Sequence, residues 1–278
     1  MKKVCIIGLG LIGASLGKSL KTRPNKYHIS GIVRKKDAAK EVLKAGAADA
    51  VYLDYRKISD SDIVVIALPI DKTAQIYKEI APFLKNGAIV SDTGSIKGAV
   101  EKEIASFIKT NKSAPDFVGA HPMTGKEKNG LFYSEADLFK GANTVITGSI
   151  KKLSENEAKI AQMWRDTGAA IIKMPSKKHD ELVSFTSHLP HLIAFALNKI
   201  YKDKKKKAPA IESIAAGSFY SAIRVASSSA DMWAPIFVSN SVNTKKNLQN
   251  FIRHLNLFAA SFKDKEKIKK KILESQET

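Results

Sequence analysis

Several residue types are scarce in this sequence, and each shortage excludes a class of protein. Cys5 is the single cysteine among 278 residues, so a disulfide framework is excluded and a reducing, cytoplasmic location is expected. No apolar run approaches the roughly 18 residues that a membrane-spanning helix needs. The chain opens with MKK and passes directly into an apolar segment, so we also expect no signal peptide.

Arginine is scarce as well, although the chain is strongly basic. Six of the 46 basic residues are arginines, and the formal net charge is +19. Such a charge can indicate nucleic-acid binding, but the lysines are spread over the whole chain. The dense runs KDKKKK at 202–207 and KDKEKIKKK at 263–271 contain acids, and we interpret them as solvated segments. We expect a surface that attracts anionic small molecules, with neither nucleic acid nor a membrane as partner.

The first half of the chain alternates short β-branched runs with helical patterns. This alternation is typical of a parallel sheet covered by helices. The expected strands are residues 4–8, 28–33, 63–68, 88–92, 117–120 and 144–147, with a last edge strand at 170–174. The clearest helices are expected at residues 72–84, 97–109 and 154–167.

The second half, from about residue 178, shows helical patterns and no convincing strand. One helical face is apolar at 248, 251, 252, 255, 258, 259 and 262. So long an apolar stripe in a domain of about 100 residues needs a partner surface. This surface is either a second copy of the chain or an intrachain core, and we favour a homodimer. The predicted organisation is an α/β domain at 1–176 and an all-α domain at 177–278.

A glycine fingerprint follows the first predicted strand. The segment reads Gly8-Leu9-Gly10-Leu11-Ile12-Gly13 and opens a helix. In this context the first glycine makes a tight turn, the second lets the backbone approach a pyrophosphate, and the third lets helix and strand pack closely. The helix N-terminus then offers N–H groups to the phosphates. We expect Gly8, Gly10, Leu11, Ile12 and Gly13 to bind a dinucleotide.

The end of the second predicted strand bears on which dinucleotide binds. NAD-binding chains usually carry Asp or Glu near this point, to accept from the ribose 2′-hydroxyl. Here Val33 is followed by Arg34, Lys35 and Lys36, and the nearest acid is Asp37. Cations suit a 2′-phosphate, so we favour NADP, with NAD as the alternative; a solvated helix start would also explain these residues.

Two polar side chains follow later strands of the same predicted sheet. Ser95 comes after the strand at 88–92, and His121 comes after the strand at 117–120. Pro122 restricts His121 to extended backbone. Because ligands of open α/β sheets bind at the carboxyl ends of the strands, we expect the glycine turn, Ser95 and His121 to meet at one edge.

Two further segments lie in the helical half. Thr186-Ser187-His188-Leu189-Pro190-His191 contains two histidines, and Arg224 stands between two apolar residues, ahead of Asp231-Met232-Trp233. Taken singly, Arg224 could be a surface arginine. The histidine pair could suggest a metal, but there is no cysteine cluster or HExxH-type arrangement, so we expect no metal site. Pro190 either begins a helix or kinks one.

Together these segments resemble the prephenate/arogenate dehydrogenase family of tyrosine biosynthesis. GLGLIG, DTGSIKG, GAHPMTGKEKNG, HD at 179–180, SHLPH and RVASSSADMW occur in the family's order and approximate spacing over nearly the whole chain. The resemblance implies a Rossmann-type domain, an all-helical dimerisation domain, and an active site in the cleft between them. It also implies oxidative decarboxylation of prephenate to 4-hydroxyphenylpyruvate, or of arogenate to tyrosine, with hydride transfer to NAD(P).

The resemblance also implies roles for individual residues. By matching motif, His121 would take the proton from the ring hydroxyl of the substrate, and Ser95 would hydrogen-bond that hydroxyl and the histidine. Arg224 would bind the ring carboxylate, and His191 would help to hold the side-chain end. A neutral imidazole suits the first role, since its ordinary pKa lies near neutrality.

Four more residues match family positions. His179, Asp180 and Glu127 would shape or gate the cleft, and Trp233 would line the site, from the same or the partner subunit. Two rival functions remain open. One is another β-hydroxyacid-type dehydrogenase or reductase, although we find no Gly-x-x-x-Lys-type segment near 180–200. The other is a regulator that senses NAD(P) without turnover, which would not need a proton acceptor.

Overall fold

The computed structural model describes residues 1–23, 25–126, 128–148 and 153–276. The chain divides into two compact units. The Rossmann unit comprises Met1–Asp180 and Ser227–Ser239, and the helical unit comprises Glu181–Ala226 and Asn240–Thr278. The predicted domain boundary after residue 176 stays a prediction.

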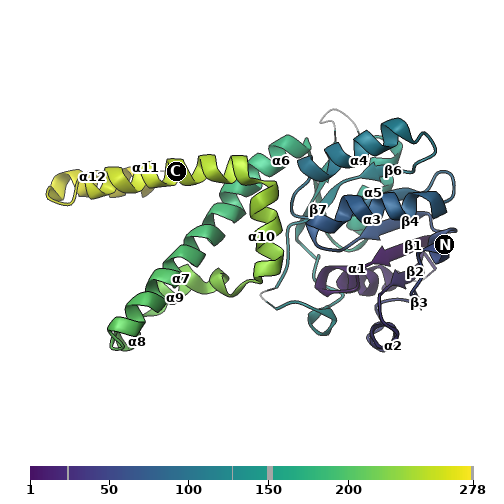
Figure 1. Cartoon of the computed structure of the whole chain (residues 1–278), viewed down its shortest axis with the longest axis horizontal. Coiled ribbons are helices and arrows are strands. Elements are labelled where there is room, and N and C mark those ends of the chain that lie inside the picture. Colours follow the sequence, from purple (N-terminus) through teal and green to yellow (C-terminus); the bar gives the residue numbers. More distant parts are fainter. Residues whose placement is uncertain (24, 127, 149–152, 277–278) are drawn as a thin grey trace. The chain divides into compact units, whose positions relative to one another are not determined.

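A six-stranded parallel sheet forms the centre of the Rossmann unit (Figure 1). Its strand order is β3-β2-β1-β4-β5-β6. The strands are β1 (Lys2–Ile7), β2 (Tyr27–Ile32), β3 (Ala50–Tyr52), β4 (Ile63–Ile66), β5 (Ile89–Asp92) and β6 (Asp116–Val118). The order reverses between β1 and β4, which is where open α/β sheets bind ligands. β3 was not predicted, and the other five strands were.

Five helices accompany this sheet: α1 (Leu11–Lys21), α2 (Lys36–Lys44), α3 (Ile70–Ile80), α4 (Gly98–Thr110) and α5 (Glu155–Asp166). α1 packs against α5 and α3 packs against α4, so helices cover both faces of the sheet. Short 3₁₀ turns lie at Tyr55–Ile58, Ala81–Phe83 and Leu131–Tyr133. The central strand β4 is wholly apolar and buried, and the last four residues of its neighbour β1 are apolar and buried as well, as expected for a sheet with two covered faces.

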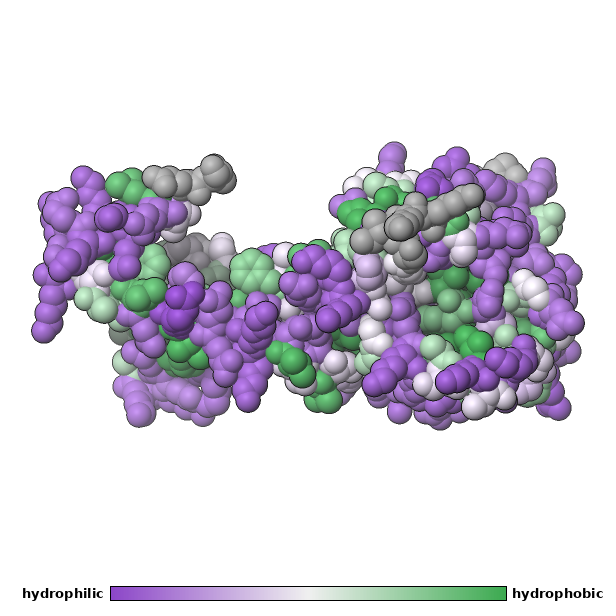
Figure 2. Space-filling view, turned by 90° about the horizontal axis from the view of Figure 1, so that it is seen from above, coloured by the Kyte–Doolittle hydropathy of each residue, from purple (hydrophilic) through white to green (hydrophobic). Residues whose placement is uncertain are grey.

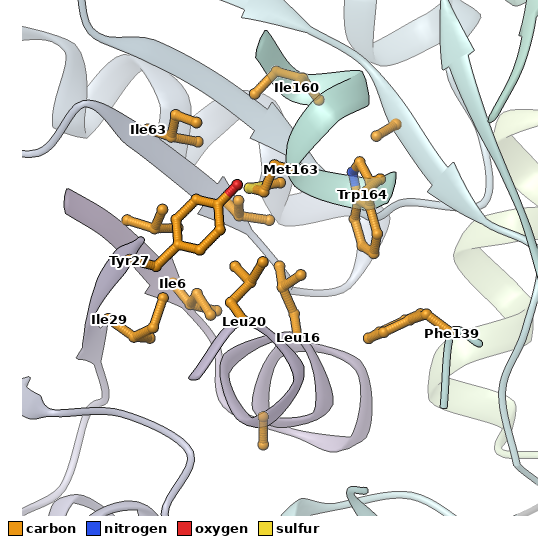
Figure 3. Close-up of a cluster of buried hydrophobic side chains, with 14 of the residues drawn as sticks. Ile6, Leu16, Leu20, Tyr27, Ile29, Ile63, Phe139, Ile160, Met163 and Trp164 are labelled. Carbon is orange, nitrogen blue, oxygen red and sulfur yellow. The ribbon is translucent and has the colours of Figure 1, made fainter. Parts of the chain in front are cut away.

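The core beneath α1 and α5 contains Leu16, Leu20, Ile160, Met163 and Trp164 (Figure 3). The Trp164 ring is 0% exposed and meets Phe139 edge to face, with ring centroids 5.1 Å apart. Each large apolar side chain buried in this way stabilises the folded state by roughly 1.5–3 kcal/mol relative to an exposed side chain. This packing holds the helix that follows the glycine fingerprint firmly against the sheet.

A second, three-stranded sheet changes one prediction. It has the order β7-β8-β9, formed by β7 (Ala120–Pro122), β8 (Asn143–Thr147) and β9 (Ala170–Met174). The predicted strand at 117–120 was therefore wrong in extent, because the chain leaves the parallel sheet at Gly119. A Cβ atom on Gly119 would lie 2.3 Å from Thr147 Oγ1 and 2.4 Å from Glu101 Oε1, so a side chain here would displace the Thr147 and Glu101 side chains.

The remaining described elements are helical, which confirms the predicted fold class of an α/β Rossmann-type domain followed by an all-α region. α6 (Ser176–Val183) continues through a π-helical segment (Ser184–His188) into α7 (Leu189–Lys207). Pro190 lies in the first turn of α7. Next come α8 (Ile211–Ile214), α9 (Gly217–Ile223), a 3₁₀ turn (Arg224–Ser227), α10 (Ala230–Ser239), α11 (Ser241–Ala259) and α12 (Lys265–Gln276).

The apolar stripe predicted in this region lies on α11 and just beyond it. In the single chain much of the stripe is exposed: Ile252 is 46%, Leu255 50% and Phe262 72% exposed. Figure 2 shows hydrophobic patches among the charged side chains of this unit. No helix within the described ranges combines the length and the apolar character that crossing a bilayer requires.

Candidate active site

The glycine fingerprint forms the turn between β1 and α1. Gly8 has φ +94°, and a Cβ atom there would lie 2.5 Å from the Ala67 carbonyl oxygen. A Cβ atom on Gly13 would lie 2.0 Å from the Gly8 carbonyl oxygen. Both positions therefore require glycine for the fold itself: Gly8 for the backbone conformation, and Gly13 for close packing of helix against turn.

Gly10 differs from its two neighbours. It is the N-cap of α1, and a Cβ atom built on it meets nothing within 4 Å. The fold alone does not exclude a side chain here, but a ligand approaching the backbone would. Leu11 is buried and Ile12 half-buried, so these residues present backbone rather than side chains to a ligand. This arrangement fits a dinucleotide pyrophosphate at the N-terminus of α1.

The second strand ends without an acid. β2 stops at Ile32, and Arg34 and Lys35 are exposed. Asp37 lies in the first turn of α2, 3.7 Å from the ammonium group of Lys40. The exposed positive charge at this strand end suits an anionic group on the ribose.

Ser95 lies in the loop between β5 and α4, and a buried ion pair shapes this loop. Lys97 donates to the Asp92 carboxylate and, at 2.8 Å, to the Ala120 carbonyl oxygen. Asp92 also accepts the N–H groups of Gly94 at 3.0 Å and Ala120 at 3.1 Å. Lys97 is 1% and Asp92 0% exposed. These contacts tie the Ser95 loop to β7, the strand that carries His121.

His121 occupies the middle of β7, an edge strand that pairs antiparallel with β8. Its expected position directly after a strand of the parallel sheet was wrong, because β6 already ends at Val118. The expected meeting of the glycine turn, Ser95 and His121 at one edge stays a prediction. The ring is nevertheless held in place: its Nδ1 lies 2.8 Å from His179 Nε2, and the two rings meet edge to face. The half-buried His121 and the 1% exposed His179 are thus joined across 58 positions in sequence.

Asp180 completes a chain of three side chains behind the site. Its Oδ1 lies 2.8 Å from His179 Nδ1, and it accepts the backbone N–H groups of Lys97 at 3.0 Å and Gly98 at 2.8 Å. Burial raises the pKa of Asp180, but the hydrogen bonds from His179, Lys97 and Gly98 outweigh it, so the pKa lies below its ordinary value. Asp180 is therefore ionised at neutral pH.

The helical unit brings together two of the predicted residues. His191 lies in the first turn of α7, with its Nδ1 2.9 Å from the Ser187 carbonyl oxygen. Burial lowers the pKa of His191 and the nearby charge of Arg224 lowers it further, although the hydrogen bond to Ser187 acts in the opposite direction. His191 is therefore neutral at pH 7. Arg224 is exposed, directly after α9.

The other predicted residues have separate positions. Glu127 lies outside the described residues. Trp233 is buried in α10, which packs on α3 within the Rossmann unit, and its ring centroid is 5.2 Å from that of Phe237. In the part of the chain that the structure describes, no three His, Cys, Asp or Glu residues are grouped as metal ligands would be.

The roles of Asp92 and Lys97 and the contact between His121 and His179 were not predicted from the sequence. Both residues of the ion pair lie within the segment DTGSIK, which was noted for Ser95 alone. A lysine before a helix is ordinarily a solvated residue, so nothing in its spacing indicates burial. The histidine contact depends on the packing of α6 against β7, and no local pattern predicts it.

Comparison with known proteins places the chain in a family. A model described as prephenate dehydrogenase, nucleotide-binding domain, matches residues 16–173, and one described as prephenate dehydrogenase, dimerization domain, matches residues 175–272. The prephenate dehydrogenase of Lactococcus lactis subsp. cremoris is 32% identical over 260 residues, which are 93% of this chain and 71% of that protein. The cyclohexadienyl dehydrogenase of Zymomonas mobilis is 31% identical over 258 residues, 91% of this chain and 86% of that protein.

Solved structures agree. A crystal structure of prephenate dehydrogenase from A. aeolicus, in complex with hydroxyphenyl propionate and NAD+, has a TM-score of 0.88 and 28% sequence identity. The match covers 99% of this chain and 96% of that one. Because the nucleotide-binding model alone covers more than half of the chain and the dimerization model most of the rest, the chain belongs to the prephenate dehydrogenase family.

Proposed function

We propose that this protein catalyses the oxidative decarboxylation of prephenate to 4-hydroxyphenylpyruvate, or of arogenate to tyrosine. Family membership supports this reaction class. The observation that carries the proposal is the orientation of His121, whose ring is fixed through Nδ1 by His179. His121, half-buried in β7 and supported by the buried His179 of α6, provides a proton acceptor, which a regulator that only senses NAD(P) would not need.

Each proposed residue has a chemical task. His121 takes the proton of the ring hydroxyl through Nε2 as that oxygen becomes a carbonyl, and Ser95 hydrogen-bonds the hydroxyl. General-base help of this kind contributes roughly 100- to 10,000-fold in rate. A bound nicotinamide supplies the hydride acceptor. Loss of CO2 and aromatisation of the ring make the reaction strongly downhill.

Arg224 and His191 bind the substrate in this proposal. The guanidinium of Arg224 grips the ring carboxylate through two parallel N–H···O bonds. His191 holds the side-chain end; its Nδ1 is engaged by Ser187 and the ring is neutral. His179 supports His121, and the positions of Glu127 and Trp233 near the substrate stay predictions.

For the cofactor we propose NADP, held at the glycine turn and at the end of β2. Arg34 and Lys35 are exposed there, and the nearest acid, Asp37, lies beyond them in α2. Arg34→Ala combined with Lys35→Ala should raise the KM for NADP at least tenfold and change the KM for NAD little. An equal change for both cofactors, or a wild-type preference for NAD, would contradict the proposal.

We further propose a homodimer formed through the helical unit. The exposed apolar residues Ile252, Leu255 and Phe262, together with the match to a dimerization domain, support this arrangement. Sedimentation equilibrium should give twice the chain mass, and Leu255→Glu should shift the protein toward monomer. A wild-type monomer at micromolar concentration would refute the dimer.

One assay tests the function. Prephenate and arogenate are each offered with NAD and with NADP, and the absorbance of reduced nicotinamide is followed. Turnover of at least one pair is expected, and turnover should fall about 100- to 10,000-fold in His121→Asn with little change in KM. No turnover with any pair, together with tight nucleotide binding, would favour a sensing regulator; turnover of other hydroxy acids would favour the rival dehydrogenase class.

A further inference from the structure

We infer that His179 and Asp180 act behind His121 as a proton relay; this inference rests on the proposed role of His121 as proton acceptor. Both are positioning residues, since they touch His121 or each other and act on the substrate only through it. All three side chains lie within the Rossmann unit and are linked by contacts of 2.8 Å.

The direction of each hydrogen bond follows from Asp180. An ionised carboxylate can only accept, and Asp180 already accepts from the backbone of Lys97 and Gly98. His179 must therefore donate to it through Nδ1–H. In the neutral ring His179 Nε2 then carries a lone pair and accepts from Nδ1–H of His121. The chain thus fixes His121 as the tautomer whose Nε2 can take a proton.

The same chain gives the proton a path. When the substrate O–H bond breaks, its proton bonds to His121 Nε2 and its electron pair forms the carbonyl as hydride leaves for the nicotinamide. The Nδ1 proton of His121 then crosses 2.8 Å to His179 Nε2. The positive charge comes to rest on His179, beside the Asp180 carboxylate, and one proton has moved at each step. The chain resets when the shared proton returns from His179 Nε2 to His121 Nδ1 and the Nε2 proton of the half-buried His121 passes to solvent.

Burial favours this arrangement. His179 is 1% and Asp180 7% exposed, so water competes little with the hydrogen bonds that order the rings. The Lys97 ammonium lies close by, but Asp92 neutralises it, which leaves the charge of Asp180 to act on the histidines. The first turn of α4 also carries Glu101, and α6 carries the charged residues Lys177, Lys178 and Glu181.

The first test needs no turnover. Long-range ¹H–¹⁵N spectra of the protein without ligands report which nitrogen of each histidine carries the proton. The relay requires the Nδ1–H tautomer in both His121 and His179. The variants His121→Asn and His179→Gln identify which signal belongs to which ring. In His179→Phe the His121 signal should lose its preference for this tautomer. An Nε2–H tautomer in either ring of the wild-type protein would overturn the inference.

The second test uses kinetics. Asp180→Asn and His179→Phe should each lower kcat about 10- to 100-fold, a part of the general-base contribution, with KM within about twofold. Because the Asp180 charge favours the protonated histidines, Asp180→Asn should move the acid limb of kcat/KM to lower pH. His179→Gln, whose amide oxygen can still accept from His121, should recover part of the loss in His179→Phe. The matched control is His28→Gln, because His28 also lies beside a carboxylate, Asp49, at 3.7 Å; its kinetics should not change.

The outcomes separate the relay from the proposed function. If His121→Asn is inactive while His179→Phe keeps the wild-type kcat and the wild-type acid limb of the kcat/KM pH profile, the relay is wrong and the role of His121 as general base stands. If His121→Asn keeps activity, the proposed function itself fails. If circular dichroism shows that Asp180→Asn does not fold, the histidine tautomers and the kinetics of the His179 variants still decide whether the relay exists.

Discussion

Lys97 and Asp92 form a buried ion pair between the start of α4 and the end of β5. The same lysine donates to the Ala120 carbonyl oxygen, and the aspartate accepts the Ala120 N–H group. The backbone on either side of Ser95 is thereby fixed to the residue that precedes His121. The ion pair therefore positions both proposed reacting groups, although Ser95 follows β5 of the parallel sheet and His121 lies within β7 of the second sheet.

Breaking this pair should weaken the fold. Lys97→Met leaves the Asp92 carboxylate buried without its cation, and removing one partner of a buried pair costs about 3–5 kcal/mol. Urea unfolding should show this loss. The control is Lys3→Met, which breaks the exposed pair between Lys3 and Asp60 and should change the free energy of unfolding far less, because water screens this pair. Equal losses in the two variants would show that the buried pair has no special role.

Gly10 and Gly13 should respond differently to the same substitution. Gly10→Ala adds a methyl group where the protein has no atom within 4 Å, so the melting temperature should stay within about 2 °C of wild type. The methyl group would, however, occupy the approach of the pyrophosphate to the backbone. Titration calorimetry should show at least tenfold weaker binding of the nicotinamide cofactor.

Gly13→Ala is the matched comparison. Its Cβ atom would lie 2.0 Å from the Gly8 carbonyl oxygen, so the turn must shift and the melting temperature should fall by several degrees, since about 1 kcal/mol corresponds to 2–4 °C in a chain of this size. Unchanged cofactor affinity in Gly10→Ala would remove that glycine from the proposed site.

Much of the fold was predictable because it depends on local patterns. The strands β1, β2, β4 and β5 are each at least four residues long, contain β-branched residues, and alternate with segments of helical periodicity. β3 escaped prediction because Ala50–Tyr52 has three residues and pairs only with β2. The change of sheet at Gly119 escaped because it depends on contacts with Thr147 and Glu101, which are remote in sequence.

The site divides in the same way. The glycine fingerprint and Ser95 could be placed from sequence, since each follows directly from a strand and a turn. The environment of His121 could not, because His179 approaches it from a helix 58 residues later. Asp180 could be noted from the sequence because it follows His179. Its two backbone hydrogen bonds could not, because they require the start of α4, at Lys97 and Gly98, to lie next to α6.

Arg224 should determine substrate affinity. A charge-assisted hydrogen bond contributes about 1.5–3 kcal/mol, so Arg224→Ala should raise the KM for the substrate about 10- to 150-fold and change kcat less. Arg224→Lys keeps the charge but loses the two-pronged geometry, so it should recover only part of the affinity. Steady-state kinetics decide, with the exposed Arg165→Ala as control; an unchanged KM would exclude the carboxylate role.

Glu101 should make stability depend on pH in a direction unusual for a carboxylate. It lies in the first turn of α4, where Thr147 donates to it, and burial, opposed by the hydrogen bonds from Thr147 and Ser176, raises its pKa above the ordinary 4.5. A pKa that is higher in the folded than in the unfolded state means that the protein has a larger free energy of unfolding when Glu101 is protonated than when it is ionised. Its contribution is therefore fully present below pH 4.5 and is lost as the pH rises through the folded pKa.

Glu101→Gln removes this titration while keeping an oxygen that can accept from Thr147. At pH 7 the variant should be more stable than wild type, because the half-buried position no longer carries a charge. Near pH 4 the difference should disappear, because the wild-type carboxyl is then protonated as well. Urea unfolding at both pH values measures the change, with Glu103→Gln, an exposed residue on the same helix paired with Lys78, as control. A variant that is less stable than wild type at pH 7 would mean that the charged carboxylate stabilises the start of α4, contrary to the direction of its pKa.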